Sequence, residues 1–330
     1  MRDDPRDLST ACYPWFARLW EQLANNRQAD HMAHALLFTG GEGIGRRHFV
    51  DRLVASLLCN NITEEGRACG QCQACQVHRG GAHPDYLAVG LPEGKKQIPV
   101  AAIRTLTEFL TLSCSYGGFR VVFIDAADQM NVNAANSLLK SLEEPPPNTV
   151  IILLAEQSLK LPITIRSRCQ QYTLATPIEA DSLAWLAQYP LKTPAEKLLS
   201  IAANRPLLAL NFDRQTGYME DRHRFAIDIA GIVTEQKSIT VVAKAWEKYD
   251  LNSLLDWQLQ WLHQLFKNNL IAPQKIVDNK LMSCLASAFS TPDKLWVTYE
   301  RLIQMKKLTD YPLNRLIFNE AMLLSWVDTP

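Results

Sequence analysis

The most constraining feature of the sequence is a glycine-rich loop that joins a short apolar run to a helical pattern. The apolar run covers residues 36–39, Gly40 and Gly45 bound the loop, and the helical pattern covers residues 47–58. Glycines at this spacing let backbone N–H groups point inward at a helix start and form an anion cradle. The loop therefore predicts a strand–loop–helix unit of the phosphate-binding type.

The two residues that carry the chemistry of such a loop are altered. A working loop continues from its last glycine into Lys and then Ser or Thr, whereas Arg46 and Arg47 occupy those positions here. Arginine keeps the charge but has a planar fork in place of a compact ammonium, and Arg47 has no hydroxyl for Mg²⁺. A glycine-rich turn without chemical meaning is the alternative, but spacing and context favour a degenerate loop inherited from an ATPase. Nucleotide binding stays doubtful.

A second apolar run, residues 121–124, ends at Asp125 and is typical of the Walker B strand that places a carboxylate near Mg²⁺. Active ATPases of this kind follow that aspartate with a glutamate, but Ala126 stands here. Asp128 lies three residues on and is expected to point elsewhere. Ala155 occupies the strand tip where a polar sensor residue is expected. With the two arginines, these changes predict that the chain does not hydrolyse ATP.

Short apolar runs alternate with helical patterns through the first half of the chain. The periodicity predicts strands at residues 36–39, 86–89, 120–124, 150–154 and 171–174, and helices at 47–58, 100–112 and 133–142. Such alternation implies a parallel sheet covered by helices. Beyond about Thr176 only helical patterns remain, at residues 178–187, 194–203, 251–270 and 312–326. Trp257 and Trp261 widen one apolar stripe, which we interpret as core packing.

These patterns divide the chain into three predicted domains. An α/β domain covers residues 1–175, a small helical domain residues 176–216, and an all-helical domain residues 217–330. Lys plus Arg and Asp plus Glu each number 34, and this zero net charge argues against a dedicated DNA-binding protein. The charged N-terminus does not resemble a signal peptide, and no apolar run is long enough to cross a bilayer. We therefore expect a cytoplasmic protein without a membrane partner.

Half of the cysteines are clustered with the spacing C-x9-C-x2-C-x2-C. They are Cys59, Cys69, Cys72 and Cys75. Four thiolates in tetrahedral coordination are the commonest closed structural zinc site, so zinc is the predicted metal. Free thiols and an iron–sulfur cluster are the alternatives, and His78 and His83 are surplus to a four-ligand site. The remaining cysteines are interpreted as packed thiols: Cys12, Cys114, Cys169 and Cys284.

Four segments together resemble the AAA+ clamp-loader subunits of bacterial DNA polymerase III. They are His-Ala-Leu-Leu-Phe at residues 34–38, His-Pro-Asp-Tyr at 83–86, the segment 134–146 containing Leu-Leu-Lys-Ser-Leu-Glu-Glu-Pro-Pro, and Arg-Ser-Arg-Cys at 166–169. The resemblance is strong over residues 13–175 and weak beyond, where Asn314, Leu316, Glu320 and Leu323 look like a collar helix. It implies an AAA+ (RecA-like) parallel sheet with a zinc-knot insertion at about residues 59–75, a helical lid and a helical collar domain.

The resemblance also implies a place in an assembly. Gamma/tau chains of the family hydrolyse ATP with an intact Lys-Thr or Lys-Ser pair, whereas Arg46, Arg47, Ala126 and Ala155 resemble the non-hydrolysing branch. The family assembles a hetero-pentamer from delta, gamma/tau and one non-hydrolysing chain, which opens the sliding clamp and closes it on primed DNA. Arg168 would act in trans as an arginine finger in the ATP site of a neighbouring gamma/tau chain, a contribution worth roughly 10³–10⁵ in rate.

Alternatives to this interpretation remain at three points. Arg168 could form only a surface salt bridge, and Arg166 is a weaker finger candidate that we interpret as structural. The whole chain could be an active gamma/tau-like ATPase. It could also be a zinc-dependent nucleic-acid-binding module, although the neutral charge disfavours this. The branch interpretation predicts a stator that braces the assembly and completes the ATP site of one partner.

Overall fold

The computed structural model describes residues 12–116, 118–271, 292–309, 311 and 313–327. The chain divides into two compact units. The first comprises Met1–Leu191 and Ala202–Leu210, and the second comprises Lys192–Ile201 and Asn211–Pro330. The finer division into three domains with boundaries near residues 175 and 216 stays a prediction.

The first unit is built on a five-stranded sheet with the order β2-β3-β4-β1-β5. All neighbouring strands are parallel. The strands are β1 (Ala35–Thr39), β2 (Tyr86–Val89), β3 (Arg120–Ile124), β4 (Thr149–Ala155) and β5 (Gln170–Thr173). The predicted parallel sheet is therefore confirmed, and the predicted strand ends differ from these by no more than a residue.

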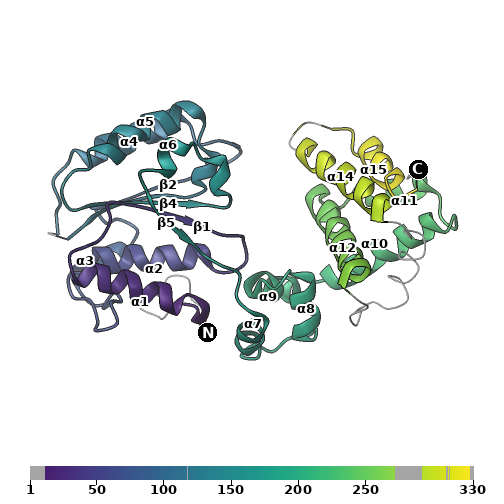
Figure 1. Ribbon diagram of the computed structural model, residues 1–330, viewed down its shortest axis with the longest axis horizontal. Helices are drawn as coiled ribbons and strands as arrows, with labels where there is room; N and C mark the ends of the chain where they lie inside the picture. Colours follow the sequence, from purple (N-terminus) through teal and green to yellow (C-terminus); the bar gives the residue numbers. More distant parts are fainter. Residues whose placement is uncertain (1–11, 117, 272–291, 310, 312, 328–330) are drawn as a thin grey trace. The chain divides into compact units, whose positions relative to one another are not determined.

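Both faces of the three inner strands, β1, β3 and β4, are buried, which explains why these strands are apolar at successive positions. In β1, Leu36 and Phe38 pack with one core, while Leu37 packs with the other. Figure 1 shows the helices that cover each face. On one side lie α1 (Ala17–Gln28) and α2 (Arg46–Leu58), and on the other lie α4 (Val100–Leu110), α5 (Val132–Glu143) and α6 (Ile163–Arg166).

The connections and the following segment add short helices. They are η1 (Pro14–Phe16), α3 (Gln73–Arg79), η2 (Ala127–Gln129), η3 (Ser158–Lys160), α7 (Glu179–Leu186), α8 (Ala195–Ile201) and α9 (Pro206–Arg214). The helices predicted at residues 178–187 and 194–203 correspond to α7 and α8. Helix α9 was not predicted, although Pro206 occupies its first position, where a proline is favoured because its missing N–H would lack a partner anyway.

The second unit contains α10 (Tyr218–Val233), α11 (Ile239–Trp246), α12 (Leu251–Ile271), α14 (Pro292–Leu308) and α15 (Arg315–Leu324). Trp257 and Trp261 are buried in its core, so their interpretation as packing residues is confirmed. The Trp257 indole donates to the Tyr218 hydroxyl at 2.7 Å. The last predicted helix, 312–326, is shorter in the structure, and its predicted first residue lies outside the described residues.

Asp85 fixes the edge of the first unit. Its buried carboxylate accepts hydrogen bonds from the backbone N–H groups of Ser115 at 2.8 Å and Tyr116 at 3.0 Å. The Asp85 N–H donates to Nδ1 of His83 at 3.1 Å, which explains structurally two positions of the His-Pro-Asp-Tyr segment. These bonds tie the loop that precedes β3 to the start of β2.

Asp85→Asn should lower the free energy of unfolding by about 1.5–3 kcal/mol, the usual value of hydrogen bonds to a charged group. The amide keeps one acceptor but turns an NH₂ donor toward a backbone N–H group, which leaves a buried donor unsatisfied. Urea unfolding would measure the change, with the exposed Glu93→Gln as the control. A loss below about 0.5 kcal/mol would contradict this role, because exposed substitutions already vary by that amount.

Candidate functional site

The ends of three neighbouring strands bring the predicted nucleotide-site residues together. The glycine loop follows β1, Asp125 follows β3, and Ala155 ends β4. The Gly40 N–H donates to the carbonyl oxygen of Ala155 at 3.3 Å, which joins the loop to the tip of β4. Ligands of open parallel sheets bind outside the carboxyl ends of the strands, so the loop stands at the expected place.

The backbone of the glycine loop has the form of a phosphate cradle. Gly45 is the N-cap of α2 with φ of 87°, and Gly43 has φ of 78°. Both conformations favour glycine because other residues carry a Cβ that is strained there. The loop therefore retains the shape that the glycine spacing predicts.

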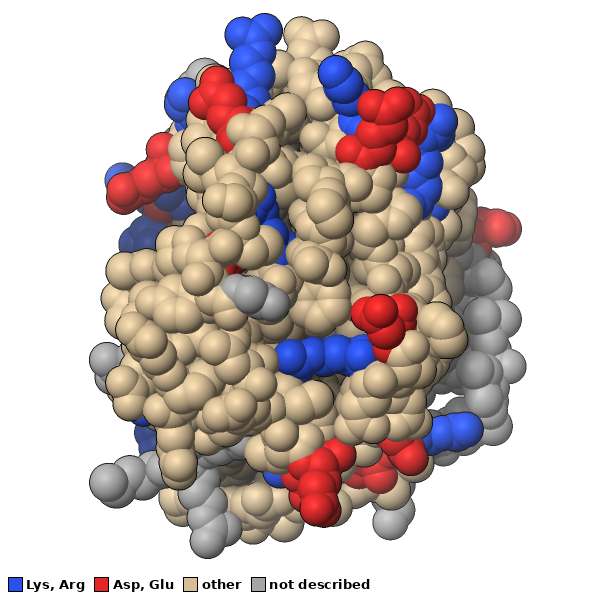
Figure 2. Space-filling view, turned by 90° about the vertical axis from the view of Figure 1, so that its left-hand side faces the viewer, with Lys and Arg blue, Asp and Glu red and all other residues tan. Residues whose placement is uncertain are grey.

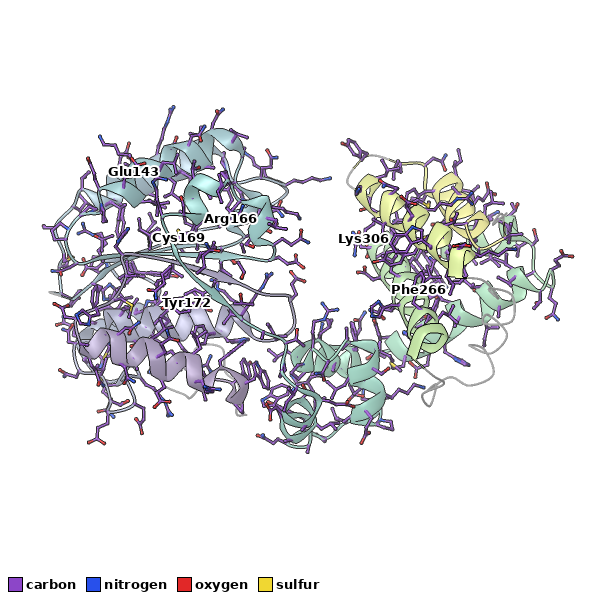
Figure 3. All side chains as sticks on the ribbon, viewed as in Figure 1. Glu143, Arg166, Cys169, Tyr172, Phe266 and Lys306 are labelled. Carbon is purple, nitrogen blue, oxygen red and sulfur yellow. The ribbon has the colours of Figure 1, made fainter. Side chains whose placement is uncertain are left out.

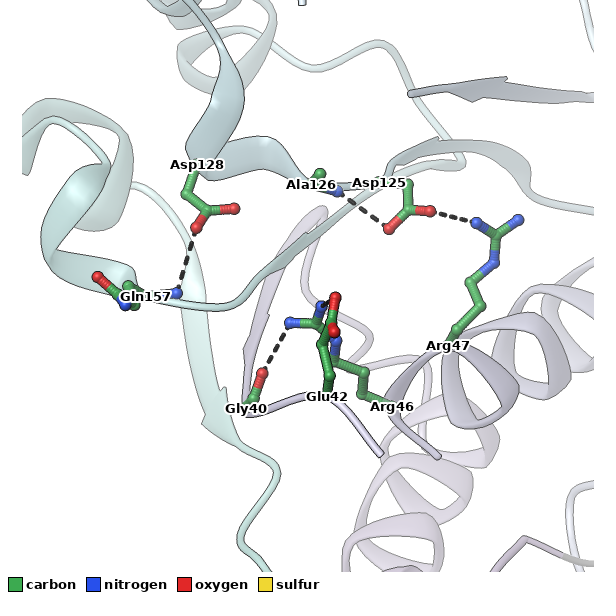
Figure 4. Close-up of polar contacts among 8 residues, drawn as sticks. All are labelled: Gly40, Glu42, Arg46, Arg47, Asp125, Ala126, Asp128 and Gln157. Atoms are coloured by element: carbon green, nitrogen blue, oxygen red, sulfur yellow. Dashed lines mark hydrogen bonds and ion pairs between the residues drawn. The ribbon is translucent and has the colours of Figure 1, made fainter. Parts of the chain in front are cut away.

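Arg46 folds back over this loop. Its Nη1 donates to the carbonyl oxygen of Gly40 at 2.8 Å, and its Nη2 lies 3.4 Å from Oε1 of Glu42. The side chain is only 18% exposed. Figure 4 shows the guanidinium turned toward Gly40 and Glu42. The charge of Arg46 is thus used in contacts with the loop itself.

Arg47 makes an ion pair with the Walker B carboxylate. Its Nη1 contacts Oδ2 of Asp125 and its Nε donates to Oδ1 of Asp51 at 2.9 Å, while the guanidinium lies over the Phe123 ring. Burial lowers the pKa of Arg47, but the two carboxylates outweigh it and the net shift is upward. The other Asp125 oxygen accepts the Ala126 N–H at 3.0 Å. The carboxylate expected near Mg²⁺ is therefore satisfied within the protein.

Asp128 does not replace the missing glutamate. Its Oδ2 accepts a hydrogen bond from the backbone N–H of Gln157 at 3.3 Å, beyond the end of β4. Figure 4 shows this carboxylate bound to Gln157, apart from the pair of Asp125 and Arg47. The residue after Asp125 is Ala126, which has no group that could polarise water. The expectation that Asp128 points elsewhere is confirmed.

An aromatic segment before α1 covers the outer side of the loop. A Cβ added at Gly45 would lie 2.2 Å from the Tyr13 ring, so only glycine fits beneath it. The Tyr13 and Trp15 rings stack with centroids 5.0 Å apart, and the Trp185 ring packs edge-on against both. The Trp15 indole donates to the Ile44 carbonyl at 2.9 Å. Tyr13, Trp15 and Trp185 are distant in sequence from the loop or from one another, so local spacing could not predict that they cover it.

The start of α9 closes the loop from another side. The Gly43 carbonyl oxygen accepts hydrogen bonds from the N–H groups of Leu207 at 3.0 Å and Leu208 at 3.4 Å. A Cβ at Gly43 would lie 2.5 Å from the Leu208 Cβ. Free N–H groups at a helix start commonly bind anions, but these two bind the loop itself.

The two arginines of the Arg-Ser-Arg-Cys segment differ in their surroundings. Arg166 is half-buried, and its carbonyl oxygen accepts a hydrogen bond from Gln171 at 3.0 Å. Arg168 is 36% exposed, and its Nη2 lies 2.6 Å from Oε1 of Glu143. Its Nη1 donates to the carbonyl oxygen of Thr164 at 3.0 Å. Arg168 is thus the more accessible cation of the two.

The structure brings the four clustered cysteines together at the end of α2 and the start of α3. All four Sγ atoms lie within 4.8 Å of one another. The Cys59–Cys69, Cys59–Cys72 and Cys69–Cys75 sulfurs are 3.6, 3.8 and 4.0 Å apart. A tetrahedral zinc with Zn–S bonds of 2.3 Å requires S···S separations of about 3.8 Å. The geometry fits a single tetrahedral ion, whereas a cluster of several irons needs sulfurs spread farther apart.

Backbone groups support the sulfurs. The Cys69 N–H donates to the Cys59 sulfur at 3.3 Å, and the Cys72 N–H donates to the Cys69 sulfur at the same distance. Such hydrogen bonds orient metal ligands and stabilise thiolates. Arg27 holds the end of α2 by donating to the Cys59 carbonyl at 2.9 Å. His78 and His83 do not join the cluster, in agreement with their exclusion from the ligand set.

The other described cysteines are free thiols. Burial raises the pKa of Cys12 and of Cys169 to about 12, which makes their thiolates rare at neutral pH. Cys114 is half-exposed, and Cys284 lies outside the described residues. Within the part of the chain that the structure describes, no helix combines the length and the apolar character that crossing a bilayer requires.

Comparison with known proteins decides the family. Residues 16–177 match the family model described as DNA polymerase III, delta subunit. DNA polymerase III subunit delta' of Pseudomonas aeruginosa is 35% identical over 96% of this chain and 98% of its own length. The chain belongs to the delta' subunits of DNA polymerase III. The Haemophilus influenzae subunit delta' is 32% identical over 79% of each chain, and the Escherichia coli subunit delta' is 37% identical over 53% of this chain and 52% of its own.

Membership in the delta' family makes the chain a component of a bacterial DNA polymerase III and confirms the resemblance drawn from the four segments. Among solved structures, a gamma-subunit-related protein of DNA polymerase III from Thermotoga maritima aligns over 93% of this chain and 99% of its own, with 15% identity and a TM-score of 0.45. That overlap is too loose to carry an argument about function. The roles of individual delta' residues must come from the geometry of this chain.

Proposed function

We propose that this chain is the non-hydrolysing delta' subunit of a clamp loader. It braces the assembly as a stator and supplies Arg168 in trans to the ATP site of a neighbouring gamma/tau chain. Delta is its other partner, and the sliding clamp and primed DNA are reached through the complex in the cytoplasm. The small helical domain of residues 176–216 serves as a lid, and residues 217–330 serve as the collar that joins the subunits.

One observation carries the non-hydrolysing part of this proposal: the two arginines of the glycine loop are used within the protein. Arg47 stands in place of the hydroxyl residue and pairs with Asp125, so the two positions that would otherwise bind Mg²⁺ bind each other. Arg46 is bound to the Gly40 carbonyl oxygen and to Glu42 within the loop. ATP hydrolysis in this class depends on positioning and on charge stabilisation by lysine and Mg²⁺. The contacts of Arg46 and Arg47 within the protein support the loss of the lysine function and of the Mg²⁺ site.

The surroundings of Arg168 support a contact with a partner. Ile163 at the start of α6, the residue before the Thr164 that binds Arg168, is 65% exposed. Arg168 lies five positions after Ile163 and is itself accessible. An arginine beside apolar contacts has the composition expected where two subunits meet.

The cysteine cluster is assigned to a structural zinc ion. Cys59, Cys69, Cys72 and Cys75 supply four thiolates and leave no open coordination position, so the ion stabilises the loop and does not activate water. The ligands join the end of α2 to the start of α3. The zinc therefore contributes to the fold of the first unit and takes no part in ATP chemistry.

The purified chain should show no ATP hydrolysis above background at saturating Mg-ATP. Arg47→Thr should not restore it, because Ala126 still provides no group to polarise the attacking water and Arg46 still lies over the loop. A coupled phosphate-release assay would measure the rate, with an intact gamma/tau chain as the positive control. Turnover by the isolated wild-type chain comparable to that control would contradict the proposal and favour an active ATPase.

Binding of primed DNA by the isolated chain would favour the nucleic-acid-binding alternative. Blue and red side chains are interspersed among the described residues of the face in Figure 2, and no broad basic field is seen there. Strong DNA binding usually needs several clustered Lys and Arg side chains. We expect weak or no retention of primed DNA in a filter-binding assay at physiological salt unless gamma/tau and delta are present.

A further inference from the structure

The Arg168 side chain is held between the ends of two helices. Its Nη1 donates to the Thr164 carbonyl oxygen at 3.0 Å and lies 3.5 Å from the Ser167 hydroxyl. Its Nη2 lies 2.6 Å from Oε1 of Glu143, the last residue of α5. A guanidinium carries five N–H groups, and among the described residues none accepts a hydrogen bond from Nε of Arg168. The side chain is therefore anchored at one end and still able to donate.

The backbone that carries Glu143 is fixed. Leu142, the neighbouring residue in α5, is buried, and its carbonyl oxygen accepts a hydrogen bond from Nε2 of His34 at 3.1 Å. His34 immediately precedes β1, so the end of α5 is tied to the sheet. Figure 3 shows Glu143 at the end of α5, on the same side of the sheet as Arg166 in α6.

The backbone that carries Arg168 is fixed as well. Its N–H donates to the Ile165 carbonyl at 3.1 Å, and both Ile165 and Cys169 are buried against the sheet core that α5 shares. The two charged side chains thus extend from rigid supports. Their separation is set by packing and does not depend on a flexible loop.

Glu143 is the last residue of α5, a position where an acidic side chain destabilises a helix. A helix C-terminus carries a partial negative charge and prefers cations, and Lys140 in the last turn of α5 follows that preference. Glu143 opposes it. Arg168 offsets the unfavourable position by bringing a guanidinium to the carboxylate, so the acid is best explained by its partner.

We propose that Glu143 is a positioning residue for the Arg168 finger. Its carboxylate and the Thr164 carbonyl hold the guanidinium at the surface before a gamma/tau chain arrives, which reduces the rotamer freedom that the long side chain must lose on binding. The ion pair between Arg168 and Glu143 is half-exposed and therefore weak. The remaining N–H groups of Arg168 can donate to a phosphoryl group without the loss of a strong bond. This inference rests on the proposed role of Arg168 as a finger acting in trans.

The test uses the assembled loader with delta, gamma/tau and primed DNA, and compares Glu143→Gln, Arg168→Ala and the double variant. The Arg168-dependent rate is defined as the wild-type ATPase rate minus the rate of Arg168→Ala. Glu143→Gln should lower this rate by about threefold to fivefold, the largest effect typical of an exposed ion pair. The KM for ATP should stay unchanged, because the finger acts on the reaction step and not on the binding of ATP.

The double variant should match Arg168→Ala, since Glu143 acts only through Arg168. Glu144→Gln, a neighbouring exposed acid, is the matched control and should retain the wild-type rate. An Arg168-dependent rate at or above wild type in Glu143→Gln would overturn the inference while the finger stands. A double variant well below Arg168→Ala would also overturn it. If Arg168→Ala itself keeps the wild-type rate, the finger proposal fails and the inference fails with it.

Discussion

Arg168→Ala should abolish the contribution of one ATP site while the loader still assembles. A finger lowers the barrier by neutralising charge that develops on the transferred phosphoryl group, and its loss costs roughly 10³–10⁵ in rate at the site that it serves. Arg168 is accessible and reaches the surface next to exposed Ile163. No other described side chain depends on its guanidinium for burial, so folding and assembly should be unaffected.

The measurement separates that site from the others. With three gamma/tau chains implied by the family resemblance, steady-state DNA-dependent ATPase should fall by about a third if the sites act independently, and by much more if they fire in order. Rapid-quench kinetics should show the loss of one fast phase. Arg168→Lys should recover little, because an ammonium lacks the planar fork. Lys160→Ala, which removes an exposed cation from η3, is the control. If all fast phases of ATP hydrolysis persist in Arg168→Ala, Arg168 does not act as the finger.

Loss of the metal should have the largest effect on stability. Cys75→Ser should remove the zinc and lower the free energy of unfolding by roughly 2–5 kcal/mol, the range typical for removal of a native cross-link. Cys59 and Cys75 are buried, and their sulfurs belong to a cluster whose members are within 4.8 Å. Without a cation these sulfurs cannot remain charged side by side, and the loop between α2 and α3 should loosen.

The zinc prediction is checked by metal analysis and urea unfolding of the full chain. Wild type should carry one equivalent of zinc, and a strong chelator should shift its unfolding midpoint toward that of Cys75→Ser. Cys114→Ser alters a thiol outside the cluster and should change neither quantity. A wild-type chain that is folded without metal, and as stable as the same chain with zinc, would show that the cluster is a set of packed thiols.

The inner strands of the first unit could be located from sequence because each is short, apolar and buried on both faces. The helical segments were harder. Helix α1 and helix α9 were not predicted; Leu23 is the buried residue of α1, so this helix adds little buried apolar sequence to the pattern. The small helical domain and the collar stay predictions, because their boundaries depend on contacts that local periodicity does not report.

The candidate site divides in the same way. Residue types and spacing predicted a phosphate loop with altered chemistry, and the four cysteines were identified by spacing alone. What the loop arginines contact was not predictable. Arg47 and Asp125 are 78 residues apart, and nothing in their local sequence indicates that they meet. The cover by Tyr13 and the bonds from Leu207 to Gly43 are likewise contacts between distant segments.

By itself the sequence determined which groups are present: a cradle of glycines, arginines in place of lysine and hydroxyl, four spaced thiols and Arg168. These follow from short-range spacing, which covalent geometry converts directly into local shape. Only the tertiary structure decided how those groups are used, because side chains far apart in the chain meet only after the sheet has brought the ends of its strands together. It turned the two loop arginines inward onto the protein and placed Glu143 against Arg168.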